Sequence, residues 1–503
     1  MRHLFLLALA VVCSACTVVS APSITSTPTL APTPLTATSA TPPPPIALAP
    51  YRAAMKPEFA AEVDRFATAP QYQIDLTIAP DRASYSAKQQ VHYTNNESMP
   101  LKEVYFSLFA NLDSYGGDVQ VQSVRVNGQD VRPKWEEANS ALRIDLAQPL
   151  QPGESIDIEM TCTGAVPTSD VELGYNQFGL HDNVLALPNF YPQIPAYDDR
   201  GWNIARGPGY GDAVFSDTAL YQVNITAPSD QVVAASGVCD PAGSGATTTW
   251  HCVSGPMRDF MIAMSPDFEV KSSTVEDVKI NSYYLKDDAK AGAHALQIVS
   301  DAVKSYSQRI GPYPFTELDL VETPTTAGGI EYPGLIVVAE SLYQDQSDFF
   351  EGATAHEAAH QWWYSLVGDD QINDPWLDEA FAQFTTALYY MDVYGKNGMN
   401  GYVQSLQGRY DRVKGTAQDK RSDLPVADYS PRQYGAIVYG KAALFFNALY
   451  EALGDEKFDQ MMQEYFQTYR YGVAYPKDLL AIAAKYVDQK TLDELVKKWI
   501  TGP

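Results

Sequence analysis

The sequence predicts two folded domains in series: an N-terminal all-β, sandwich-like domain and a second, mainly helical α+β domain. Between residues 71 and 270, short runs of alternating apolar and polar residues are separated by turn residues, which is the period of half-buried strands. After about residue 285, apolar residues return at helical spacing instead. The chain has 503 residues, more than one ordinary hydrophobic core supports.

The first domain is placed at residues 51–272. A short lead-in helix is expected at 51–67, and strands are expected wherever the alternation is clear. The clearest runs are Tyr72, Ile74, Leu76 and Ile78; Val119, Val121, Val124 and Val126 with a shift of register; and residues 142–146 and 156–160, separated by a turn at 149–153.

The second domain is placed at residues 273–503. Helical periodicity predicts helices at 289–310, 349–367, 376–394, 436–453 and 492–500. We find no internal repeat.

The N-terminus has the pattern of an export signal over residues 1–16. Arg2 precedes an apolar run that is too short to cross ~30 Å of hydrocarbon. Ser14, Ala15 and Cys16 resemble the lipobox of bacterial lipoproteins, which implies a lipid anchor on Cys16, although Cys13 stands where leucine is usual. Ordinary secretion, with cleavage near Ala15 or Ala21, is the alternative.

Residues 17–50 are rich in proline, threonine, serine and alanine and contain no charged residue. Such a segment cannot bury a core, and we expect an extended tether. No later stretch reaches ~20 consecutive apolar residues. An extracytoplasmic, membrane-anchored location on the cell surface or in the periplasm is therefore expected.

The net charge and the cysteine content narrow the possible functional classes and partners of the protein further. The formal net charge is -26 and the pI is about 4.5, which argues against a nucleic-acid partner. In an oxidising compartment, Cys239 and Cys252 are expected to form a disulfide across a turn-rich hairpin. Cys162 would then be unpaired and buried.

Two histidines lie four residues apart in His356-Glu357-Ala358-Ala359-His360. On a helix both imidazoles share one face and reach a single ion. With only seven histidines in the chain, this pattern with its glutamate arises by chance about 0.005 times. The alternative is two histidines packed in a core.

A third metal ligand is needed for a catalytic zinc site. Glu379 follows His360 by 19 positions, and Asp374 and Pro375 look like the start of a second helix that carries it. Metzincins would need glycine and histidine where Trp363 and Leu366 stand, so that class is excluded. On spacing alone, the nearby acidic residues Asp369, Asp370, Asp374 and Asp378 remain competitors.

These motifs together resemble the gluzincin aminopeptidases related to aminopeptidase N and leukotriene hydrolase. Gly328-Gly329-Ile330-Glu331-Tyr332 stands where that family has Gly-x-Met-Glu-Asn, and Tyr439-Gly440-Lys441-Ala442 is similar to its Tyr-x-Lys-Gly. The four motifs span about 110 residues in the family's order. The resemblance implies a thermolysin-like zinc peptidase domain behind the β domain.

The resemblance also implies roles for individual residues. His356, His360 and Glu379 would hold one Zn²⁺, and Glu357 would act as general base. Tyr439 would donate to the oxyanion. Glu331 would bind the free α-ammonium of a peptide, beside a backbone edge opened by Gly328 and Gly329.

Alternatives remain beside these roles. Tyr434 competes with Tyr439, and Glu331 could be a surface carboxylate. Four aromatic residues near the motifs are expected in the core, namely Trp362, Trp363, Phe381 and Phe384. Residues 187–193 are expected to correspond to a loop that faces the site. Tyr332, Ile330 and Ala442 depart from the family pattern, and the bulk of Tyr332 puts substrate preference and strict exopeptidase action in question.

The expected activity is zinc-dependent removal of N-terminal residues from peptides that carry a free amine. Only 64 residues follow Tyr439, too few for the helical domain that closes over the site in larger relatives, so an open site is expected. A zinc endopeptidase with an open cleft and a catalytically silent, anchored binding protein are the alternatives.

Overall fold

The computed structural model describes residues 47–168 and 174–503. The predicted export signal, Cys16 and nearly all of the predicted tether lie outside the described residues. In the part that is described, no helix has the length and apolar character needed to cross a membrane.

The predicted lead-in helix is two short 3₁₀ helices, Pro50–Ala54 and Ala60–Phe66. Lys56-Pro57 lies between them, and a residue before proline is disfavoured in the α conformation, so one continuous helix does not form. Tyr51, Met55 and Val63 pack in the core of the second domain.

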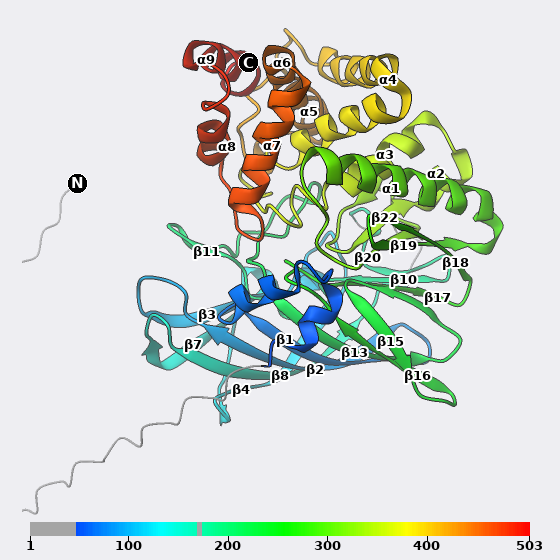
Figure 1. Cartoon of the computed structure of the whole chain (residues 1–503). Coiled ribbons are helices and arrows are strands. Elements are labelled where there is room, and N and C mark those ends of the chain that lie inside the picture. Colours follow the sequence, from blue (N-terminus) through cyan, green and yellow to red (C-terminus); the bar gives the residue numbers. More distant parts are fainter. Residues whose placement is uncertain (1–46, 169–173) are drawn as a thin grey trace, which may run out of the picture. The chain divides into compact units, whose positions relative to one another are not determined.

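The β domain is built around an eight-stranded sheet in the order β15-β16-β13-β1-β2-β8-β4-β5 (Figure 1). All its neighbouring strands pair antiparallel except β1 and β13. The strands are β1 (Gln71–Ile78), β2 (Ser84–Thr94), β4 (Asp118–Val126), β5 (Gln129–Asp130), β8 (Ser155–Ala165), β13 (Leu220–Pro228), β15 (Val238–Ala242) and β16 (Thr247–Val253).

Three smaller sheets complete this domain. The short β11 (Tyr197–Asp198) and β12 (Gly201–Trp202) form a ribbon of their own. The others are β3-β7-β6 (Leu101–Ser107, Ala141–Leu150, Lys134–Glu136) and β14-β17-β10-β9 (Val232–Ala235, Met261–Ser265, Val184–Pro188, Gly179–His181).

The strand predictions are confirmed by the burial pattern. Ile74 in β1, Ile158 in β8 and Val223 in β13 are buried in one core. The shift of register in β4 is an irregularity between Val121 and Ser123, which keeps Val119 and Val124 buried on the same core. The predicted all-β domain is therefore correct.

The predicted disulfide is confirmed. Cys239 and Cys252 oppose each other in the β15–β16 hairpin and are bonded. Cys162 in β8 is buried as a free thiol.

The second domain contains a five-stranded sheet in the order β18-β19-β20-β22-β21. Its strands are β18 (Phe268–Val275), β19 (Val278–Leu285), β20 (Glu317–Thr323), β22 (Leu335–Ala339) and β21 (Gly329–Ile330). The predicted boundary at residues 272 and 273 falls inside β18, which pairs with β19 along its length. The short β21 forms one edge of this sheet.

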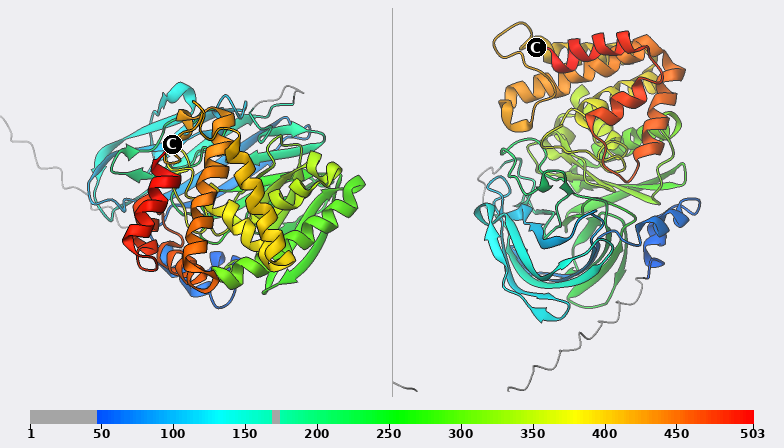
Figure 2. Two further views of the ribbon diagram at one scale, coloured as in Figure 1. Left: turned by 90° about the horizontal axis from the view of Figure 1, so that it is seen from above. Right: turned by 90° about the vertical axis from the view of Figure 1, so that its left-hand side faces the viewer.

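Helices form the rest of the domain and gather on the side away from the β domain (Figures 1 and 2). The helix α1 (Ala289–Arg309) packs on the sheet through β18 and β19. The others are α2 (Glu340–Asp345), α3 (Asp348–Ala359), α4 (Glu379–Asp411), α5 (Pro431–Ala436), α6 (Ala443–Leu453), α7 (Asp455–Tyr469), α8 (Pro476–Ala483) and α9 (Gln489–Val496).

Several helix boundaries differ from the prediction. The helix predicted at 349–367 ends at Ala359, because the chain then turns sharply and Tyr364 adopts a φ of 107°. The helix predicted from residue 376 begins at Glu379, where the carboxylate of Asp378 accepts the Glu379 N–H at 2.7 Å. It continues past residue 394 to Asp411 through a kink at Gly395.

Residues 437–442 and 497–501 are π-helical turns that adjoin α6 and α9. The helices α2, α7 and α8 were not predicted, and α5 was predicted only at its last residue, Ala436.

Arg258 in the β domain fixes the loop that follows His360. Its fully buried guanidinium donates to the carbonyls of Tyr364 (2.8 Å), Ser216 (3.0 Å) and Gly472. The Tyr364 hydroxyl donates to Asp259. The β domain therefore holds the backbone next to His360.

Candidate active site

The three predicted metal ligands converge at the junction of α3 and α4. Nε2 of His356 lies 3.1 Å from Oε2 of Glu379 and 3.2 Å from Nε2 of His360, and the third side of this triangle is 3.3 Å. Zinc bonds of about 2.0–2.1 Å place the donor atoms of a tetrahedron about 3.3 Å apart. Two imidazoles and one carboxylate at this spacing fit Zn²⁺.

Contacts behind the ligands fix their orientation. Nδ1 of His360 lies 3.0 Å from the carbonyl oxygen of Trp363, which leaves Nε2 free to bind a metal. The side-chain amide of Gln383 lies 3.3 Å from Nδ1 of His356, and the Tyr402 hydroxyl donates to Gln383 Oε1 at 2.8 Å. Such partners are typical of metal sites.

The local charges keep His356 and Glu379 in their metal-binding forms. Burial, followed by the charge on His360, lowers the pKa of His356 to about 4, so its imidazole is neutral at pH 7. Burial raises the pKa of Glu379, but hydrogen bonds from His356 and His360 hold it well below its ordinary value. Burial lowers the pKa of His360, but the charge of Glu331 and the hydrogen bond with Glu379 raise it well above its ordinary value, so His360 would lose a proton on binding a metal ion.

Glu357 lies beside this triangle without belonging to it. Carboxylate oxygens of Glu357 and Glu331 and a nitrogen of His360 all lie within 4.8 Å of one another. Glu357 is 5% exposed, and burial raises its pKa well above the ordinary value, which makes it a stronger proton acceptor. Gly329 permits this packing, because a Cβ there would lie 2.5 Å from Glu357 Oε1.

Glu331 lies immediately beyond β21, and its carboxylate enters the site. It is 5% exposed and accepts a hydrogen bond of 2.8 Å from Gln371, whose amide also donates to Asp378 at 2.8 Å. Glu331 is therefore an oriented, buried group and not a surface carboxylate.

Tyr332 does not fill the site in front of Glu331. Its ring packs in a separate apolar cluster with Val184 and Leu335, and its carbonyl accepts from Gln361 at 3.1 Å. Tyr332 borders only a small secondary cavity of about 20 Å³.

Tyr439 contacts a metal ligand directly, since its hydroxyl donates to Oε1 of Glu379. Tyr434 packs edge-on against Tyr439, with 5.5 Å between ring centroids, and also lines the cavity. Tyr439 lies in the π-helical turn Ile437–Ala442, a distortion that is common at functional sites. Lys441 is fully buried and donates to the carbonyls of Lys420 (2.7 Å) and Gly502 (2.6 Å), which anchors this turn.

The four neighbouring aspartates lie outside the triangle of metal ligands. Asp378 caps α4, and Asp370 forms an ion pair with Arg200 at 2.6 Å. Among the described residues, no metal-binding group includes Asp369, Asp370, Asp374 or Asp378. Trp362, Trp363, Phe381 and Phe384 are fully buried core residues, as predicted.

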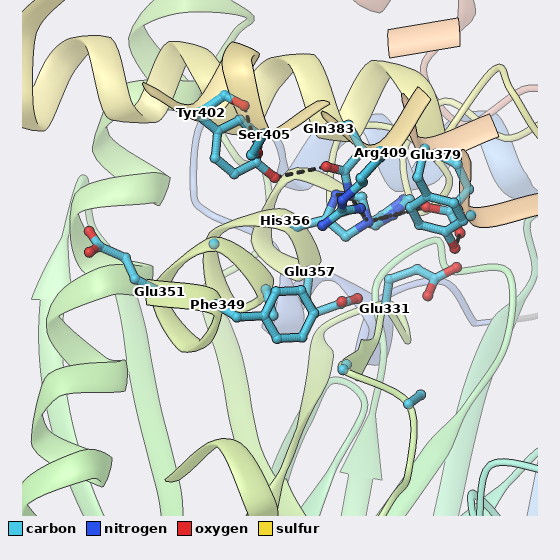
Figure 3. A pocket seen from close by; sticks show the side chains of 18 of the residues that line it. Glu331, Phe349, Glu351, His356, Glu357, Glu379, Gln383, Tyr402, Ser405 and Arg409 are labelled. Atoms are coloured by element: carbon cyan, nitrogen blue, oxygen red, sulfur yellow. Dashed lines mark hydrogen bonds and ion pairs between the residues drawn. The ribbon is translucent and has the colours of Figure 1, made fainter. Parts of the chain in front are cut away.

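The site opens into a cavity of about 1060 Å³ lined by both domains (Figure 3). The β domain contributes Tyr175, Gln177 and Asp212. Residues 187–193, expected to face the site, do not line it. Phe190 is instead packed in the β core, and Gln193 donates to the carbonyl of Arg258 at 2.7 Å, so that prediction is wrong.

Sequence reasoning also missed several residues of the cavity wall. Gln383 is one helical turn after Glu379, so helical spacing would have found it. Tyr402 and Arg409 come from the second half of α4, and their position depends on the kink at Gly395. Asp212 lies in an irregular loop with no sequence signal.

Comparison with known proteins places these features in a family. Residues 294–499 match the model described as the Peptidase family M1 domain. Aminopeptidase M1-C of rice (Oryza sativa subsp. japonica) is 26% identical over 299 residues, which are 56% of this chain and 34% of the relative. Endoplasmic reticulum aminopeptidase 2 of Homo sapiens is 28% identical over 227 residues, 41% of this chain and 23% of that protein. The chain thus spans about a third or less of these relatives.

Solved structures share the fold over a greater part of the chain. The M1 zinc metallopeptidase of Deinococcus radiodurans has a TM-score of 0.64 at 19% identity, covering 86% of this chain and 95% of that chain. A two-domain M1 zinc metallopeptidase bound to L-arginine has the same TM-score at 18% identity, covering 86% and 94%. The β domain followed by a mixed helix-and-sheet domain is thus the fold of the two-domain M1 zinc metallopeptidases, and residues 294–499 of this chain match the M1 peptidase domain.

Proposed function

We propose that this protein is a zinc-dependent aminopeptidase that acts on peptides outside the cytoplasm. One observation carries the proposal: the buried carboxylate of Glu331 lies within 4.8 Å of the Glu357 carboxylate, beside the three metal ligands. A negative group at that position suits the α-ammonium of a substrate and fixes the first peptide bond at the site of hydrolysis.

His356, His360 and Glu379 would hold the zinc. When bound, Zn²⁺ acts as a Lewis acid toward the peptide carbonyl and lowers the pKa of a water molecule toward ~7. Each ligand is already oriented by a protein contact, so little rearrangement accompanies binding.

The chain's own groups supply the proton transfers and charge stabilisation. Glu357 accepts a proton from the attacking water and returns it to the leaving amine, as its raised pKa favours. The Tyr439 hydroxyl, protonated at neutral pH because burial raises its pKa, donates toward negative charge that develops on the carbonyl oxygen. The edge strand β21 pairs with the backbone of the extended peptide.

The M1 zinc metallopeptidase of Deinococcus radiodurans bound to a Tyr-Ser-Ala substrate supports peptides as the substrate class. That structure is 19% identical with a TM-score of 0.64, covering 86% of this chain and 95% of that chain, so it supports the fold and not the residue preference.

The test compares leucine coumarinyl amide with its N-acetyl derivative. We expect the unblocked substrate to be cleaved at least ~100-fold faster, and the preference to shrink in Glu331→Gln, with surface Glu340→Gln as the matched control. Equal cleavage of both substrates would indicate an endopeptidase. Cleavage of neither by zinc-loaded protein would indicate a binding protein.

The extracytoplasmic, lipid-anchored location forms a second part of the proposal and rests on the Ser14-Ala15-Cys16 pattern. Mass spectrometry of protein from a bacterial host is expected to find a lipid-modified Cys16 at the mature N-terminus. In Cys16→Ser the protein should leave the membrane fraction. An unmodified N-terminus near Ala21 would favour ordinary secretion.

A further inference from the structure

The charges that line the cavity are unevenly distributed. The carboxylates of Asp212, Glu331 and Glu357 lie among them, in a chain of formal net charge -26. Apart from the two histidine ligands, the described lining residues that carry positive charge are Arg409 and Arg412. The cavity is therefore not uniformly suited to cationic ligands.

Arg409 has no protein partner for its guanidinium in the described parts of the chain, where neither a hydrogen bond nor an ion pair from this side chain occurs. The half-buried Arg409 differs in this respect from Arg309, which pairs with three aspartates, and from Arg200, which pairs with two. A half-buried guanidinium without a carboxylate is a free binding group for a planar anion.

Arg409 and Glu331 lie on different sides of the metal ligands. Glu331 is grouped with His360 and Glu357 within 4.8 Å, whereas Arg409 packs next to Gly440, beside Tyr439, and its charge acts on His356. Figure 3 shows Arg409 near His356 and Gln383, and Glu331 apart from it below Glu379. A peptide whose ammonium is at Glu331 must therefore extend past the ligands to reach Arg409.

One face of the helix α4 forms the cavity wall between Glu331 and Arg409. After the kink at Gly395, the residues of α4 and its C-cap that line the cavity recur at helical spacing: Asn397, Gly398, Gly401, Tyr402, Ser405, Arg409 and Arg412. Tyr402 stacks on Tyr390 with 5.0 Å between ring centroids, which adds an aromatic surface on the same side. This wall is suited to the leaving group, the part of the peptide that follows the scissile bond.

The other acidic residues on that side do not compete for Arg409. Both Tyr389 (2.7 Å) and Tyr394 (2.8 Å) donate to Oε1 of Glu351. Asp348 begins α3, eight residues before His356 and therefore about 12 Å along the helix.

We propose that Arg409 forms a subsite for a carboxylate on the leaving-group side of the scissile bond. The proposal rests on the aminopeptidase function proposed above. The carboxylate comes either from the C-terminus of a short peptide or from an aspartate or glutamate side chain just after the scissile bond. An extended dipeptide spans about 7 Å and a tripeptide about 10 Å, so peptides of both lengths belong in the test.

The experiment measures kcat/KM of the zinc-loaded enzyme on matched pairs of unblocked substrates. Leu-Ala and Leu-Ala-Ala are each compared with their C-terminal amides, and Leu-Glu-Ala amide is compared with Leu-Gln-Ala amide. We expect the carboxylate member of at least one pair to be favoured by about 10-fold to 100-fold, the value of a charge-assisted hydrogen bond. The first two pairs report a terminal carboxylate and the third a side-chain carboxylate.

Three variants test whether Arg409 causes the preference for the carboxylate substrate. Arg409→Gln should bring the ratio within about twofold of unity, mainly through KM, while Arg409→Lys should keep part of it because charge remains without the bidentate fork. The matched control Arg132→Gln alters an exposed arginine of the β domain and should keep the wild-type ratio.

The ratio of kcat/KM between the members of a substrate pair distinguishes failure of the carboxylate subsite from failure of the aminopeptidase function. If the amides are hydrolysed but every ratio is the same in wild type and Arg409→Gln, the carboxylate subsite is wrong and the aminopeptidase function stands. If no unblocked substrate is hydrolysed, the aminopeptidase function fails and the subsite fails with it.

Discussion

The two walls of the cleft differ in how completely the protein satisfies its own polar groups. At the junction of α3 and α4, the metal wall, His356, His360 and Glu379 contact one another and are buried. The rest of the cavity lining is the open wall, where Phe349 at the start of α3 is 49% exposed and β21 presents a free sheet edge. Arg409 likewise has no protein partner among the described residues.

This difference separates chemistry from recognition. Groups that stabilise a transition state must be held in place before the substrate arrives, since reorganisation during the reaction would raise the barrier. Groups that recognise a substrate have to be left available for it. The metal wall has the first property and the open wall the second, so substitutions on the two walls should differ in both size and kinetic signature.

Removal of the metal should have the largest effect. We expect chelator-treated protein, and His360→Ala, to lose all measurable peptidase activity, because the three convergent donors would hold the ion that activates the substrate. Added Zn²⁺ should restore the chelated wild type but not His360→Ala. Metal analysis and activity are measured together, and full activity at less than ~0.1 zinc per chain would contradict the assignment.

Glu357→Gln should have the next largest effect while keeping the metal. The amide has nearly the same shape but cannot accept a proton, so kcat should fall on the order of 10³-fold to 10⁴-fold with about one zinc per chain retained. Glu340→Gln on the surface helix α2 is the control. A variant with wild-type kcat would show that Glu357 is not the base.

The same division explains which features could be predicted from the sequence. The metal ligands and Glu357 lie within 24 residues of chain, on two helix ends whose local signals are strong. The open wall combines segments far apart in sequence, such as Asp212, Tyr402 and Arg409. Its geometry depends on the Gly395 kink and on an irregular loop, which no periodicity encodes.

The fold shows the same contrast between local and long-range information. The alternation in β1 and the bulge in β4 were predictable from residue spacing, because burial of one face imposes the period. The prediction that a helix begins at Pro375 failed because Asp378, not Asp374, has its carboxylate placed to cap the helix. Both residues are good caps in isolation, and only tertiary structure selects between them.

Tyr439→Phe should reduce activity less than Glu357→Gln. Loss of one oxyanion donor should lower kcat on the order of 100-fold, with KM changed by less than about threefold. Tyr434→Phe is the matched control, since this ring lines the cavity but its hydroxyl makes no contact with Glu379 in the described structure. An equal loss in both variants would mean that the two tyrosines act as a packing unit instead.

The smallest predicted effect is that of an alanine substitution at Gly328 or Gly329. These two adjacent glycines face different neighbours, the exposed Phe349 and the buried Glu357. A Cβ at Gly329 would lie 2.5 Å from Cδ and Oε1 of Glu357, whereas a Cβ at Gly328 would lie 3.1 Å from the tip of the Phe349 ring. Glu357 is enclosed and cannot withdraw without leaving its catalytic position, but the 49% exposed Phe349 can rotate away.

Gly329→Ala should therefore lower kcat on the order of 10-fold, since a displaced general base loses its alignment, while Gly328→Ala should change kcat/KM by less than about threefold. Steady-state kinetics with a zinc measurement on both variants checks this. Because neither glycine has a positive φ, alanine is compatible with both backbones and the two substitutions differ mainly in the neighbour they meet. A larger loss in Gly328→Ala than in Gly329→Ala would show that the open wall, and not the metal wall, is the rigid side of this cleft.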